Sequence, residues 1–125
     1  MNSTKAVILF YALLASIALA QEPNPYNGTW RASGEDFIDS EFVLQGEGGK
    51  WKTYLTAGRR RFDACVAMER PIVVQRSSAE ELVFLINGSK VLAGCPDIVV
   101  TLKPIDAKSL AGLLGTGVAF RAVRQ

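Results

Sequence analysis

The chain has 125 residues, two cysteines, no histidine and a formal net charge of +2, from 14 Lys and Arg against 12 Asp and Glu. This length leaves room for one small domain. The lack of histidine excludes Ser-His-Asp and Cys-His catalytic sites and removes the commonest metal ligand. We therefore expect no metal and no other cofactor, and the near-neutral charge argues against nucleic acid as a partner.

Residues 1–20 have the pattern of a secretory signal peptide. One cation, Lys5, precedes an apolar stretch of about 15 residues, which is shorter than the ~20 needed to cross a bilayer. The small side chains of Ala18 and Ala20 suit cleavage between Ala20 and Gln21. We predict a periplasmic or secreted protein without a stable membrane anchor.

The remaining residues divide into an extended arm over 21–27, rich in proline, and a single β domain over 28–125. Short segments of alternating polarity, separated by Gly, Pro, Asn or charged pairs, are typical of an all-β domain. Strands are predicted over 29–33, 37–45, 50–56, 62–68, 72–75, 82–86, 98–103 and 118–123.

Turn signals separate these strands. The glycine-rich segment 46–49 and the pair Asn87-Gly88 both predict hairpins, because glycine tolerates the positive φ of tight turns. Segment 77–81 resembles a helix capping box, but its brevity favours a turn. Segment 107–114 has leucines at helical spacing, with Asp106 as a possible cap, so a helix remains the alternative there to the strand that we favour.

The two cysteines predict one disulfide, Cys65 to Cys95, because an exported chain folds in an oxidising space. Closing a loop of about 31 residues would stabilise the domain by roughly 3–4 kcal/mol. Asn27 and Asn87 begin glycosylation sequons, and the sequence does not decide whether they are used.

About eight antiparallel strands have two unpaired edges unless the sheet closes. We therefore predict a small antiparallel barrel, with a two-sheet sandwich as the alternative. Small barrels often fill their interior with side chains, so the presence of a cavity stays open.

The segment Asn27-Gly28-Thr29-Trp30, together with Arg121 near the end of the chain, resembles the calycin pattern of lipocalins and avidins. The resemblance implies an eight-stranded up-and-down barrel whose mouth can hold a ligand. It also implies that the Arg121 guanidinium lies over the Trp30 indole and closes the bottom of the barrel, which makes both residues structural.

Arg59, Arg60 and Arg61 form the densest local charge cluster. Three guanidiniums on a loop could bind an anion or an acidic protein. Alternation places Trp51 and Tyr54 on opposite faces, so a buried Trp51 would leave Tyr54 outside, beside the arginines. These four residues, the three arginines and Tyr54, are the candidate binding rim.

We expect a monomeric exported binding protein without catalytic activity, which holds a small apolar ligand or docks a protein partner through its rim. One alternative is a carboxylate-dependent hydrolase or lyase, which would need Glu35, Asp36 or Asp63 buried near a second acid. Another alternative is a structural or assembly factor of the cell envelope, which would self-associate.

Overall fold

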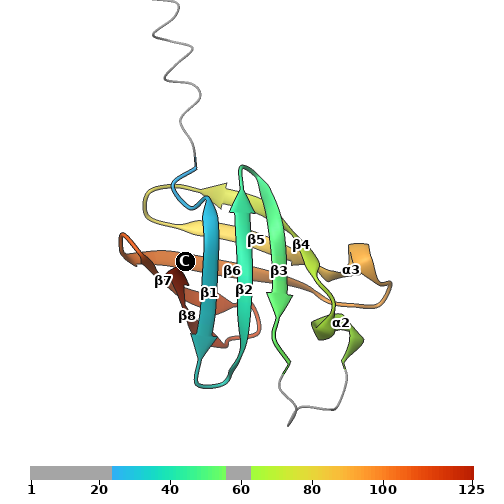
Figure 1. Cartoon of the computed structure of the whole chain (residues 1–125). Coiled ribbons are helices and arrows are strands. Elements are labelled where there is room, and N and C mark those ends of the chain that lie inside the picture. Colours follow the sequence, from blue (N-terminus) through green and yellow to red (C-terminus); the bar gives the residue numbers. More distant parts are fainter. Residues whose placement is uncertain (1–23, 56–62) are drawn as a thin grey trace, which may run out of the picture.

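The computed structural model describes residues 24–55 and 63–125, so the predicted signal peptide and the cluster Arg59 to Arg61 lie outside the described residues. Within these two segments, eight antiparallel strands form a single closed barrel (Figure 1). The predicted fold class is confirmed, as a barrel and not a sandwich. The elements are β1 (Gly28–Gly34), β2 (Phe37–Gln45), β3 (Gly48–Thr53), α2 (Ala64–Ala67), β4 (Arg70–Ser77), β5 (Leu82–Asn87), α3 (Gly88–Val91), β6 (Asp97–Asp106), β7 (Ser109–Leu114) and β8 (Ala119–Arg124).

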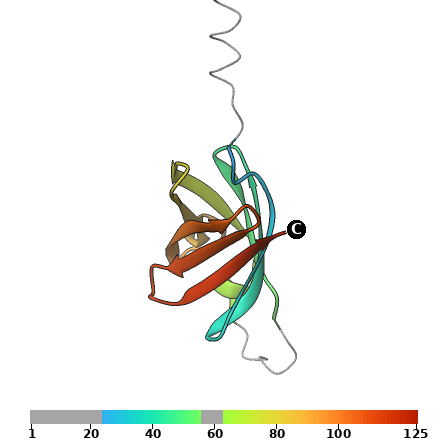
Figure 2. The same ribbon diagram turned by 90° about the vertical axis from the view of Figure 1, so that its left-hand side faces the viewer.

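Every strand pairs with the next one along the chain, and β8 returns to pair with β1. Figure 2 shows β7 and β8, in orange and red, crossing the barrel toward the blue-green strands, where β8 pairs with β1. Closure leaves no strand edge exposed in the described barrel, which removes the usual route to edge-to-edge aggregation. No helix in the described residues is long and apolar enough to cross a membrane.

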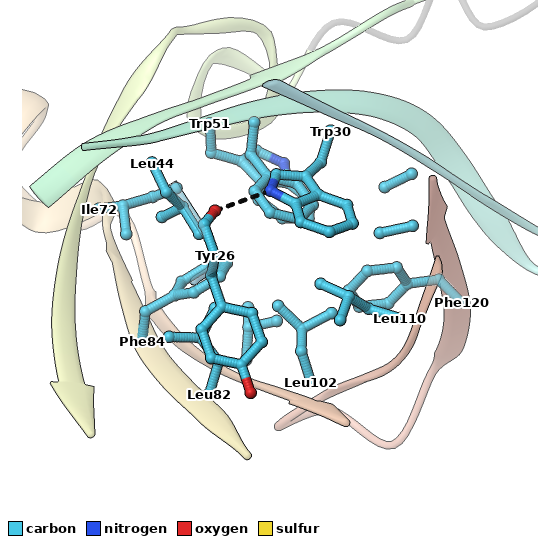
Figure 3. Close-up of a cluster of buried hydrophobic side chains, with 14 of the residues drawn as sticks. Tyr26, Trp30, Leu44, Trp51, Ile72, Leu82, Phe84, Leu102, Leu110 and Phe120 are labelled. Carbon is cyan, nitrogen blue, oxygen red and sulfur yellow. Dashed lines mark hydrogen bonds between the residues drawn. The ribbon is translucent and has the colours of Figure 1, made fainter. Parts of the chain in front are cut away.

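Alternation along the strands directs one face of each strand into the barrel. Aromatic rings occupy much of the interior, where Phe42 stacks on both Trp30 and Trp51, with centroid distances of 6.2 and 5.2 Å. The prediction that Trp51 is buried is confirmed. The buried side chains shown in Figure 3 come from strands all around the barrel and fill its centre.

The N-terminal turn closes one end of the barrel. Residues 24–27 fold back on themselves, with the Asn27 amide donating to the Asn24 carbonyl, and Tyr26 is only 3% exposed. The Tyr26 carbonyl accepts a 2.9 Å hydrogen bond from the Trp30 indole (Figure 3), and its hydroxyl donates to the Ser78 carbonyl at 2.6 Å. The predicted extended arm over 21–27 is therefore a turn in its described part, residues 24–27. This turn buries the side chain of Tyr26 at the end of the barrel.

The strand predicted over 62–68 is wrong in its described part, where α2 occupies Ala64–Ala67. Ala64, Val66 and Met68 alternate as a strand would, but the Asp63 side chain accepts a hydrogen bond from the Cys65 amide at 2.9 Å and caps a helical turn. Local capping thus prevails over the alternating pattern.

The tight turn predicted at Asn87-Gly88 is also wrong. β5 and β6 do pair as antiparallel neighbours, but α3 and a loop connect them. Gly88 does not adopt a positive φ, which the tightest hairpin turn requires. The Asp97 carboxylate instead holds the first turn of α3, accepting from the Ser89 amide at 2.9 Å and from the Ser89 hydroxyl at 3.0 Å.

The strand favoured within 107–114 is confirmed, since β7 covers Ser109–Leu114. Asp106 accepts from the Lys108 amide at 2.9 Å, so it stabilises a hairpin turn and does not cap a helix. This hydrogen bond is the main cause that lowers the pKa of the Asp106 carboxyl. The turn after β2 is confirmed as well, with Gly46 at a φ of 63°.

Candidate functional site

A pocket of about 190 Å³ opens at the end of the barrel opposite Tyr26. Its position follows from the register, because Trp30 pairs with Phe42 near the closed end, whereas Ser40 pairs with Thr53 near the other. Its lining is mostly apolar. The lining residues are Asp36, Phe37, Ile38, Ser40, Trp51, Thr53, Val66, Arg70, Ile86, Ile98, Leu114 and Val118.

The pocket wall combines fully buried residues with residues that are only partly buried. Aliphatic residues close to strand termini form part of the pocket wall, such as Ile98 near the start of β6 and Leu114 at the end of β7. Both are only half-buried. The interior is therefore packed over most of its length and hollow at one mouth.

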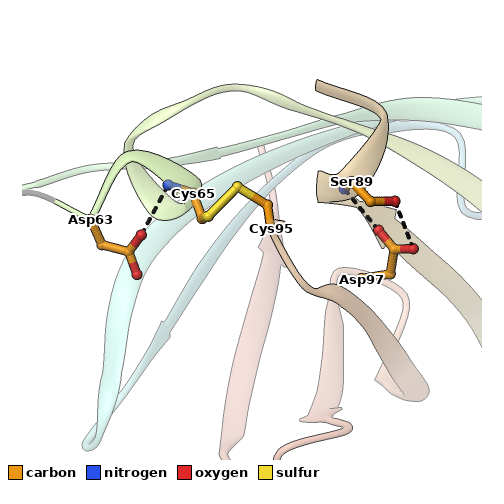
Figure 4. The surroundings of a disulfide bond; sticks show 5 residues. All are labelled: Asp63, Cys65, Ser89, Cys95 and Asp97. Carbon is orange, nitrogen blue, oxygen red and sulfur yellow. Dashed lines mark hydrogen bonds between the residues drawn. A yellow bond between two sulfur atoms is a disulfide. The ribbon is translucent and has the colours of Figure 1, made fainter. Parts of the chain in front are cut away.

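The disulfide fixes the rim of this mouth. Cys65 lies in α2 and is bonded to Cys95, with their Cα atoms 5.4 Å apart (Figure 4). The predicted pairing is thereby confirmed. Val66, the next residue of α2, lines the pocket. The bond therefore ties a pocket-lining segment to the segment that leads into β6.

Three hydroxyl and N–H groups meet at Thr53 within this largely apolar wall. The Thr53 hydroxyl oxygen accepts from the indole nitrogen of Trp51 and from Nη2 of Arg70, both at 3.3 Å. The hydroxyls of Ser40 and Thr53 are also hydrogen-bonded at 3.3 Å. These groups form one polar network on the pocket wall.

Arg70 is the most unusual member of the network. It begins β4, opposite Trp51 of β3, and is only 5% exposed. Its Nε atom is buried and has no hydrogen-bond partner in the described residues. Burial lowers the pKa of the Arg70 guanidinium, and the negative charge of Asp63 partly opposes this effect.

Arg70 is not recognisable as a site residue from the sequence, since an arginine next to Pro71 resembles an exposed turn residue. Only the pairing of Arg70 with Trp51 reveals that its side chain faces inward. That pairing joins strands on either side of α2, so no local pattern contains it. The predicted strand 72–75, in addition, began two residues too late.

The candidate rim is only partly described. Arg59, Arg60 and Arg61 lie outside the described residues, so their part in it stays a prediction. Tyr54 lies on the outer wall, opposite in direction to Trp51, as expected. Its ring lies 4.6 Å from the Arg31 guanidinium carbon, and its hydroxyl donates to Glu41 at 3.1 Å. Tyr54 is thus not among the pocket residues.

The predicted contact of Trp30 with Arg121 needs a correction. Arg124 takes that place, with its guanidinium carbon 4.3 Å from the centroid of the Trp30 ring. Arg121 is exposed and donates to the Ser109 hydroxyl at 3.3 Å. The reason is alternation, because Phe120 and Ala122 point inward in β8, and Arg124 is the next residue in that phase.

The acids invoked for a hydrolase are not buried. Glu35, Asp36 and Asp63 are all exposed, although Asp36 reaches the pocket rim. The predicted hydrolase needs one of these carboxyls to be buried in a cleft near a second acid, and none of the three is buried. The pocket consequently offers a binding wall and one buried cation.

Comparison with protein-family models, with curated proteins and with solved structures gives no significant match for this chain. Function is therefore inferred from the pocket and its residues alone.

Proposed function

We propose that the mature chain is an exported binding protein that holds one small, mostly apolar molecule in the pocket at the open end of the barrel. The observation that carries this proposal is the hollow of about 190 Å³ in an otherwise packed interior. A concave, mostly apolar pocket with a few polar groups in its wall is the usual form of a small-molecule site, and this hollow has that form.

The size of the pocket restricts the ligand. An apolar cavity of about 150 Å³ is large enough for benzene, whereas pockets for drug-sized molecules span roughly 300–1,000 Å³. The pocket therefore suits a molecule with a single ring or a short alkyl chain. It is too small to enclose a haem or a long acyl chain.

The proposed location rests on two features. A disulfide persists in the periplasm or outside the cell and is rare in the cytosol. The first 20 residues have the pattern of a signal peptide. The closed up-and-down barrel is also compatible with the calycin resemblance, in which the mouth of the barrel holds the ligand.

The proposal is tested with toluene as a neutral probe of the pocket. We expect toluene to raise the thermal midpoint of the oxidised mature protein, because a ligand that binds only the folded state stabilises it. We also expect it to change the fluorescence of Trp51, which lines the pocket. No midpoint shift at saturating toluene would contradict the proposal.

Two neighbouring residues provide a matched pair of variants. Ile98 lines the pocket, whereas Val99 points outward and is 40% exposed. Ile98→Phe should fill the hollow and abolish the toluene-induced shift. Val99→Phe adds the same ring on the outer wall and should leave the shift unchanged. Equal shifts in both variants would place the toluene site elsewhere.

A further inference from the structure

The guanidinium of Arg70 is buried in the pocket wall without a compensating charge in the described part of the chain. There, Arg76 and Glu81 make the sole ion pair, with 3.2 Å between nitrogen and oxygen. Arginine cannot escape the cost of burial by losing its proton, because its pKa is too high. Placing a charge in an apolar environment is costly unless an opposite charge accompanies it.

The hydroxyl of Thr53 cannot supply that compensation. Its oxygen has two lone pairs and one proton. Its oxygen accepts from Trp51 and from Nη2 of Arg70, which occupies both lone pairs, and it is also hydrogen-bonded to the Ser40 hydroxyl. Thr53 thus binds Nη2 of the guanidinium and satisfies only one of its five N–H groups.

The neighbouring charges do not neutralise Arg70 either. The negative charge of Asp63 acts on it, but Asp63 is exposed and makes no ion pair with it. Asp36 lies at the rim of the pocket and is also exposed. The Nε–H of Arg70 is shielded from solvent as well, so bulk water does not satisfy it.

We propose that the ligand of the pocket is a small apolar carboxylate, whose anionic group pairs with the guanidinium of Arg70 while its ring or short chain occupies the apolar part. This inference rests on the proposed function and specifies its ligand class. A carboxylate matches the planar guanidinium with two parallel hydrogen bonds. Pairing through Nε requires the guanidinium to turn toward the pocket, which the terminal torsions of arginine allow.

A carboxylate fits better than a phosphoryl group on grounds of charge. One guanidinium neutralises one negative charge, and a phosphoryl dianion would keep an excess charge in an apolar pocket. The carboxylates of Asp36 and Asp63 would further repel a dianion. The hollow then has room for roughly one aromatic ring beside the anionic group.

The test compares benzoate with benzamide, which has nearly the same shape and no charge, on the oxidised mature protein. We expect benzoate to bind at least about tenfold more tightly by calorimetry, because hydrogen bonds between charged groups are about twice as strong as neutral ones. The Nε–H resonance of Arg70 should shift with benzoate. Equal affinities would overturn the carboxylate assignment and leave the proposed function standing.

Variants on one strand locate the anion site. Arg70→Gln should bind benzoate and benzamide with about equal affinity. Arg76→Gln, at an exposed position of β4, should still bind benzoate more tightly than benzamide. A preference that persists in a folded Arg70→Gln variant would overturn the inference. If that variant does not fold, the wild-type comparison and the Arg70 resonance still decide the question.

Two further outcomes separate the two proposals. Tighter binding of phenylphosphonate than of benzoate would replace the carboxylate by a phosphoryl group and overturn the inference. Failure of toluene, benzamide and benzoate alike to bind would instead overturn the proposed function, and the inference with it.

Discussion

Arg124 and Trp30 are directly paired across strands β8 and β1, and the guanidinium of Arg124 covers the indole at 4.3 Å. The same side chain donates to two carbonyls of the N-terminal turn, at 2.6 Å to Asn27 and at 2.8 Å to Pro25. Arg124 thus binds both the first strand and the turn that precedes it. This contact closes the end that lies opposite the pocket.

The two arginines of β8 give a controlled test of this closure. Arg124→Ala removes the contact with the indole and two hydrogen bonds, so we expect it to lower the free energy of unfolding by about 2 kcal/mol. Arg121→Ala, at an exposed site, should change it by less than about 0.5 kcal/mol. Urea unfolding of both variants measures the difference, and equal effects would rule out a special role for Arg124.

Tyr26 makes stability depend on pH at the alkaline end. Burial, and then the negative charges of Glu80 and Glu81, raise the pKa of the Tyr26 hydroxyl above its ordinary value of 10.0. The unfolded chain therefore releases this proton at a lower pH than the folded one. The stabilisation from Tyr26 is complete below about pH 10 and is lost as the pH rises through the folded pKa.

Tyr26→Phe is expected to lose the hydrogen bond to Ser78, at a cost of about 1 kcal/mol at pH 8. Between pH 8 and pH 11 its stability should fall less steeply than that of the wild type, because the phenylalanine has no proton to release. Urea midpoints across this range measure both slopes. Parallel slopes would show that Tyr26 does not titrate differently on folding.

The sequence predicts the parts of the fold that depend on local alternation. The bounds of β2 coincide with the predicted segment 37–45, and Trp51 points inward as expected. The same alternation, followed from Phe120 and Ala122, selects Arg124 for the contact with Trp30. The prediction of Arg121 followed from the family resemblance. It did not take into account that Arg121 lies on the outer face of β8.

Other features depend on contacts between distant segments and could not be predicted. The helical turn α2 depends on the cap from Asp63. The alternating residues of the same segment predict a strand, and the sequence does not show which of the two signals prevails. The inward position of Arg70 depends on its pairing with Trp51. The existence of the pocket depends on how all strands fill the interior, which no single segment specifies.

The disulfide is expected to stabilise both the domain and its pocket. Replacing both cysteines, Cys65→Ala with Cys95→Ala, should lower the free energy of unfolding by roughly 3–4 kcal/mol, because the bond closes a loop between residues 30 apart in sequence. The variant should also bind toluene more weakly, since Val66 would no longer be held at the pocket. Urea unfolding and the toluene titration measure these effects, and an unchanged toluene affinity would limit the role of the bond to stability.

Gly112 and Phe120 face each other across β7 and β8, and the Phe120 ring lies over the site where a Cβ of residue 112 would be. Gly112→Ala must displace this ring, which also stacks on Phe37 at 4.7 Å. Overpacking of this kind costs about 1–3 kcal/mol. Gly48→Ala is the control, because its Cβ would find its nearest neighbour at an ordinary 3.7 Å. Urea midpoints should fall for Gly112→Ala and change little for Gly48→Ala, whereas similar losses would mean that the β strands resist alanine for a reason other than Phe120.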